Sequence, residues 1–101
     1  MNDDLPIACS LSDSELRKRE ATILAQFKGA ATKTEECDDG YSFALAGHRQ
    51  NLALVFELLA AERECCPFLK FQLETEPANG PLHLRITGPG DAKAFLTSLF
   101  G

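Results

Sequence analysis

Two adjacent cysteines and a nearby glutamate are the residues of this chain whose types and spacing best suit chemistry. The segment Glu62-Arg63-Glu64-Cys65-Cys66-Pro67-Phe68 follows the most apolar stretch, residues 52–61, and precedes an alternating run over residues 69–74. Because Pro67 disfavours helical geometry in the residue before it, we expect a helix to end at the cysteine pair. The pair is therefore predicted to lie where a helix meets a strand, at a seam that small solutes can reach.

Glu62 precedes Cys65 by three residues and Cys66 by four, so on a helix both thiols are its neighbours. On a helical projection, Glu62 falls in an apolar arc with Leu52, Val55, Phe56 and Leu59. A buried carboxylate is destabilised by several kcal/mol unless it is paired or protonated. The compensating group is expected among Arg63, Arg85, His48, a thiol proton and a bound cation.

The polarity of the expected helix favours metal binding over a redox dithiol. Thiols are activated at helix N-termini, whereas this pair lies at a C-terminal end beside two carboxylates, which raise thiol pKa values. The usual Cys-x-x-Cys spacing is also absent. A soft ion displaces the thiol protons on coordination, and Cu(I), Hg(II) and As(III) favour two or three sulfurs. Zinc would need four ligands, which requires Cys9, Cys65, Cys66 and a histidine to converge.

We therefore predict a metal site formed by Cys65, Cys66 and Glu62, with Cys9 as a possible third sulfur. Adjacent cysteines are expected to reach one tetrahedral ion only with strain, so one of them could instead belong to the core. Cys37, beside an expected hairpin turn, is predicted to be separate from the site. Two alternatives stay open: a thiol-dependent enzyme with Glu62 as proton donor, and a structural or interaction module whose buried cysteines are inert. No catalytic or cofactor-binding residue is assigned.

Length and composition indicate one globular domain over residues 5–101, preceded by a flexible tail over residues 1–4. Hydrophobic residues make up 45% of the 101-residue chain, which is enough for a core without disulfides. The net charge of -5 argues against direct nucleic-acid binding. No window resembles a membrane span, and the acidic N-terminus is unlike a secretion signal. We therefore expect a cytoplasmic protein, where cysteines usually stay reduced.

Hydrophobic periodicity and turn residues predict the element order β-α-β-β-α-β-β-α. The expected elements are strand 5–10, helix 13–28, strands 31–37 and 41–46, helix 49–65, strands 69–74 and 82–87, and helix 91–100. Because three of the strands are apolar on one side only, the sheet should be largely antiparallel with one wet face. The sequence thus predicts an α+β two-layer sandwich with the helices on one face.

Three segments form a pattern: Ile7-x-Cys9-x-Leu11, Glu62-Arg63-x-Cys65-Cys66-Pro67-Phe68-x-x-Phe71 and Phe95-Leu96-x-x-Leu99-Phe100-Gly101. This pattern resembles that of an uncharacterised family of small bacterial proteins, and it covers nearly the whole chain. Similar domains follow DNA-binding regions that resemble those of mercury-resistance regulators. By analogy, the resemblance implies a soft metal or small thiol-reactive ligand held by Cys9, Cys65 and Cys66. It also implies that any regulation needs a separate regulator as partner. The wet sheet face could meet a partner or a second copy of the chain in a homodimer, but a solvated face needs neither.

Overall fold

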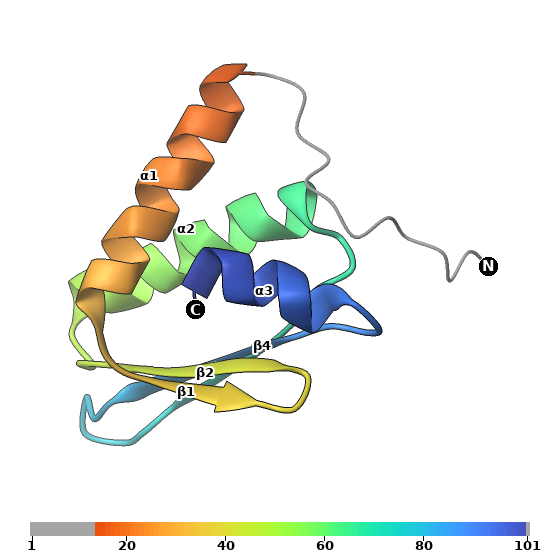
Figure 1. The fold of residues 1–101 in the computed structure, drawn as a ribbon. Coiled ribbons are helices and arrows are strands. Elements are labelled where there is room, and N and C mark those ends of the chain that lie inside the picture. Colours follow the sequence, from red (N-terminus) through yellow and green to blue (C-terminus); the bar gives the residue numbers. More distant parts are fainter. Residues whose placement is uncertain (1–13, 101) are drawn as a thin grey trace.

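A computed structural model describes residues 14–100, with three helices and four strands in that part of the chain (Figure 1). The elements are α1 (Ser14–Ala30), β1 (Ala31–Cys37), β2 (Gly40–Leu45), α2 (Arg49–Cys65), β3 (Lys70–Thr75), β4 (Leu82–Thr87) and α3 (Ala92–Phe100). The predicted α+β class is confirmed, and the order of the elements within the described range matches the prediction. The strand expected over residues 5–10 lies outside the described residues.

The four strands form one sheet in the order β1-β2-β4-β3, and every neighbouring pair is antiparallel. Side chains alternate between the two faces of a strand, so residues paired across the register share a face. Tyr41 pairs with Ile86 and Phe43 pairs with Leu84, and all four are buried. The three helices cover this apolar face, which makes the two-layer sandwich that the strand pattern predicts (Figure 1).

The main core lies between the central strands and the helices. Its helical members are Ile23 and Phe27 of α1, Val55 and Leu58 of α2, and Leu96 of α3. The rings of Phe27 and Phe100 both meet Phe43 edge-on, at centroid distances of 4.9 and 4.8 Å. This aromatic cluster ties the first and last helices to β2 and so fixes the layer that holds α2.

The hairpin between β1 and β2 forms at the predicted Asp38-Asp39-Gly40 segment. Gly40 is needed there for space, because a Cβ atom on it would lie 1.9 Å from the carbonyl oxygen of Ile86. α1 continues through Gly29 to Ala30, two residues past its predicted end, and β1 follows directly. Within the described residues, no helix combines the length and the apolar character needed to cross a membrane.

The buried stripe of α2 differs from the predicted arc. Phe56 was expected on the core side, but it is 56% exposed. The buried positions are instead Asn51, Val55, Leu58, Glu62 and Cys65. They recur every three or four residues, so they follow one helix face, and Leu52 and Leu59 lie on its flank. The prediction for Phe56 is wrong because apolar residues occur nearly all round this helix, and only the neighbouring elements decide which side is covered.

Candidate metal centre

The end of α2 brings both cysteines to the same side as Glu62. Cys65 is the last helical residue, and Cys66 caps the helix with non-helical backbone angles of φ -129° and ψ 74°. The Cys66 N–H still donates to the Glu62 carbonyl at 2.7 Å, and the Leu69 N–H donates to the Cys66 carbonyl at 3.1 Å. Because Cys66 leaves the helical geometry, as Pro67 requires, its side chain is not rotated a further 100° from that of Cys65.

One donor atom from each of Glu62, Cys65 and Cys66 lies within 4.8 Å of the other two. With metal–sulfur bonds of about 2.3 Å, two sulfurs on one ion are about 3.8 Å apart in tetrahedral geometry and about 4.6 Å apart in linear geometry. The group is therefore compact enough to share an ion after small adjustments. The non-helical cap lessens the strain that we expected from adjacent cysteines.

All three donors are buried, with exposed fractions of 2% for Glu62, 2% for Cys65 and 1% for Cys66. The two cysteines join Phe68 and Ala92 in a small apolar cluster apart from the main core, and Leu69 and Phe95 pack against it. The expectation of an open seam is wrong for these residues, because side chains that follow α2 and begin α3 cover the sulfurs. We name the group of Glu62, Cys65 and Cys66 the buried donor group.

Among the described residues, Glu62 has no basic partner, and its polar neighbours are the Glu20 carboxyl and the Cys66 thiol. Neither of its oxygens makes a hydrogen bond of good geometry. The basic residues expected to compensate it are engaged or remote: Arg85 pairs with Asp39 at 3.4 Å, and His48 Nδ1 accepts from the Asn51 N–H at 3.3 Å as the cap of α2. Arg63 is exposed. Of the predicted compensating groups, the thiol proton of Cys66, whose hydrogen bond lowers the pKa of Glu62, and a bound cation are left.

Burial and, to a smaller extent, the adjacent carboxyl of Glu20 together raise the pKa of Glu62 from 4.5 to about 8, while a hydrogen bond from the Cys66 thiol opposes the rise. Glu62 therefore carries a proton at neutral pH. Burial and the neighbouring Glu62 carboxyl also hold the pKa of the Cys66 thiol far above its ordinary value of 9.0. Without a metal, Cys66 is an inert thiol and not a nucleophile.

Cys65 is disulfide-bonded in this structure, whereas Cys37 and Cys66 are free thiols. The Cys65 sulfur can therefore act as a thiolate ligand only after that bond is reduced. Cys37 ends β1, and its carbonyl accepts from Lys93 Nζ at 2.8 Å. As predicted, it is not part of the buried donor group. Cys9, the predicted third sulfur, lies outside the described residues.

Glu20 of α1 is the residue near the site that sequence reasoning missed. Its carboxyl acts on Glu62 across the contact between α1 and α2. Glu20 precedes the buried Ile23 by three residues and the buried Phe27 by seven, which places all three on one face of α1. The sequence therefore contained one indication of Glu20's role, which is that its carboxylate shares a helix face with core residues. Glu20 lies on the side of α1 that faces α2.

Comparison with known proteins adds no assignment to this geometry. No protein-family model, no curated protein and no solved structure matches the chain. The resemblance to small bacterial proteins with a Cys-Cys-Pro-Phe motif therefore stays a prediction. Among residues 14–100, the buried donor group is the cluster of potential metal ligands.

Proposed function

We propose that the protein, in its reduced form, binds a soft metal or metalloid ion through the thiolates of Cys65 and Cys66 and the carboxylate of Glu62. The observation that carries this proposal is the grouping of two sulfurs and a carboxyl oxygen within 4.8 Å, where neither oxygen of the buried carboxyl makes a hydrogen bond of good geometry. Buried polar groups without partners are rare in folded proteins. A bound cation would supply the missing partner.

The donor set favours a soft ion over a hard one. Two thiolates with one carboxylate suit Cu(I), Hg(II), Cd(II) or As(III), whereas magnesium and calcium take oxygen ligands. Coordination would displace the protons of the two thiols and of the Glu62 carboxyl into solvent, so the raised pKa values of Cys66 and Glu62 make binding dependent on pH but do not prevent it. The apolar surroundings also strengthen the attraction between thiolate and cation, because little water screens it. Cys9 would be a third sulfur in this proposal.

The proposal requires Cys65 to be reduced, so it fits a protein that works in a reducing compartment such as the cytoplasm. A thiol-dependent enzyme is less well supported, because Cys66 is 1% exposed and its thiol holds its proton. A structural module with inert cysteines is the stronger alternative, since the apolar cluster buries both sulfurs. The metal-binding protein and the structural module can be distinguished by one property, which is whether the thiols bind a metal.

The test is a titration of the reduced, anaerobic protein with Cd(II), read by the ultraviolet absorption of cadmium–thiolate bonds. We expect stoichiometric uptake by the unaltered protein and by Cys37→Ser, which keeps the buried donor group. The double substitution Cys65→Ser plus Cys66→Ser should abolish the absorption band and weaken binding by orders of magnitude. Equal affinity in that double variant would remove the metal proposal and favour the structural module.

A further inference from the structure

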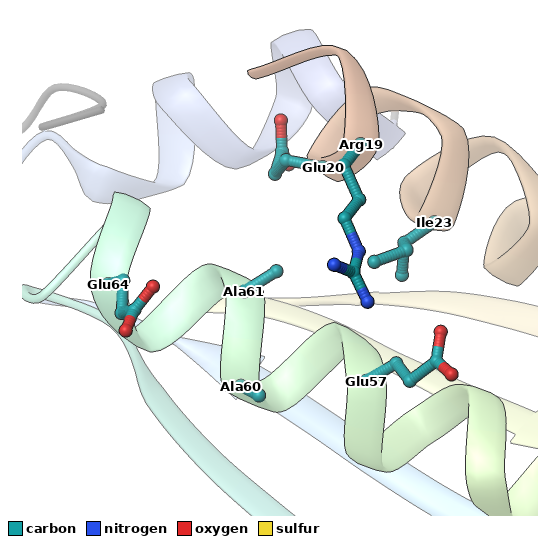
Figure 2. A pocket seen from close by; sticks show the side chains of 7 residues that line it. All are labelled: Arg19, Glu20, Ile23, Glu57, Ala60, Ala61 and Glu64. Carbon is teal, nitrogen blue, oxygen red and sulfur yellow. The ribbon is translucent and has the colours of Figure 1, made fainter. Parts of the chain in front are cut away.

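The buried donor group needs a route for ions, because its three residues are almost fully covered. A cleft of about 210 Å³ opens between α1 and α2 (Figure 2). It is lined by Arg19, Glu20 and Ile23 of α1 and by Glu57, Ala60, Ala61 and Glu64 of α2. The small side chains of Ala60 and Ala61 keep this space open on the α2 side.

The charges around the cleft favour cations. Three carboxylates line it against one guanidinium. Figure 2 shows Arg19 extending from α1 across the cleft toward Glu57, while the carboxyl of Glu20 points away from Arg19. A recess lined mainly by one sign of charge concentrates ions of the opposite sign.

Glu20 connects this cleft with the buried donor group. It is half-buried, it lines the cleft, and its carboxyl is adjacent to that of Glu62. Ala61, another lining residue, directly precedes Glu62 in the chain. Glu62 is nine-tenths or more buried, and neither of its oxygens makes a hydrogen bond of good geometry, which points to a ligand on the inner side of the cleft.

We propose that the cleft between α1 and α2 is the entrance through which a soft metal ion reaches the buried donor group, and that Glu20 passes the ion from the cleft to Glu62. This inference rests on the proposed metal-binding function and assigns the path and the positioning residue for it. Glu20 would offer the ion a carboxylate oxygen in place of part of its water while the ion is still in the cleft. Because its carboxyl is adjacent to that of Glu62, Glu20 would hold the ion next to the buried donor group.

Stopped-flow measurement of Cd(II) association with the reduced protein tests the path. Ala60→Leu adds bulk to the cleft, and Ala53→Leu makes the same change at an exposed position of α2 that does not line it. An obstructed entrance slows entry and exit equally. We therefore expect Ala60→Leu to lower the association and dissociation rate constants by the same factor, several-fold, with the equilibrium constant unchanged. Ala53→Leu should match the unaltered protein.

Glu20→Gln tests the positioning residue, with Glu57→Gln as the matched control that removes the same charge from the cleft. We expect association to slow by about tenfold in Glu20→Gln and much less in Glu57→Gln. If Glu20 only repelled the Glu62 carboxyl, its removal would make Glu62 easier to ionise, and association would instead become faster. Circular dichroism confirms that each variant is folded.

The possible failures can be told apart. If the unaltered reduced protein does not take up Cd(II), the proposed function itself is wrong. If it takes up Cd(II) but Ala60→Leu and Glu20→Gln react at the unaltered rate or faster, the entrance is overturned and the binding site stands.

Discussion

The buried carboxyl of Glu62 should make the protein less stable as the pH rises, and Glu62→Gln should remove this dependence. The pKa of Glu62 rises from an ordinary 4.5 to about 8 in the folded protein. Below pH 4.5 the Glu62 carboxyl is protonated in both the folded and the unfolded states. Between the two values only the unfolded state releases the proton, so each increase in pH favours unfolding.

The size of this effect follows from the pKa difference. At about 1.4 kcal/mol for each pKa unit, the rise to about 8 corresponds to a total loss of about 5 kcal/mol. About 3 kcal/mol of that loss falls between about pH 6 and about pH 9, where other carboxyl groups are already ionised. Glutamine has nearly the same shape and does not titrate, and its amide can donate to Glu20. The variant should therefore be the more stable protein at high pH.

Urea unfolding of the unaltered protein and Glu62→Gln at several pH values measures this difference. The Cys65 disulfide is kept intact throughout, so that both proteins unfold from the same redox state. Glu57→Gln is the control, because that carboxyl is exposed on the same helix and water solvates it in both states. We expect the difference in unfolding free energy between Glu62→Gln and the unaltered protein to grow from about pH 6 to about pH 9. A difference that stays constant over this range would show that Glu62 does not cause the loss of stability.

Three further predictions concern packing and thiol chemistry. Gly29→Ala should raise the free energy of unfolding by about 1 kcal/mol, because an added Cβ atom meets nothing within 4 Å. Gly40→Ala should lower the free energy of unfolding severely, because an added Cβ atom would clash with the backbone of Ile86. Thermal melts in which both variants behave alike would contradict this. Phe68→Ala should lower the free energy of unfolding, measured with urea, by about 3 kcal/mol. A decrease below about 1 kcal/mol would show that the cluster around the sulfurs is loosely packed. Native alkylation followed by mass spectrometry should label Cys37 before Cys66, and the reverse order would contradict the burial of Cys66.

Local sequence placed each described element boundary to within two residues. α2 begins at Arg49 and ends at Cys65 as predicted, because an apolar run there is followed by a residue that must leave the helix before Pro67. β4 also has its predicted bounds, since Gly88 and Pro89 end the alternating run. Helical periodicity also predicted the burial of Glu62, because it places Glu62 on the same side of α2 as Val55, and both are buried.

The errors concern contacts between elements, which local periodicity does not contain. Phe56 is exposed because the sheet and α1 together leave that side of α2 uncovered. The sulfurs are buried because Phe68 and Ala92, which follow α2 and begin α3, close over them. Glu20 was missed because its significance depends on which turn of α1 meets Glu62.

X-ray absorption at the cadmium edge of the reduced, Cd(II)-loaded protein tests the central claim most directly, because it identifies the atoms bound to the ion. The account predicts sulfur neighbours from Cys65 and Cys66 together with oxygen from Glu62, and loss of the oxygen contribution in Glu62→Gln. A first coordination shell without sulfur would contradict it.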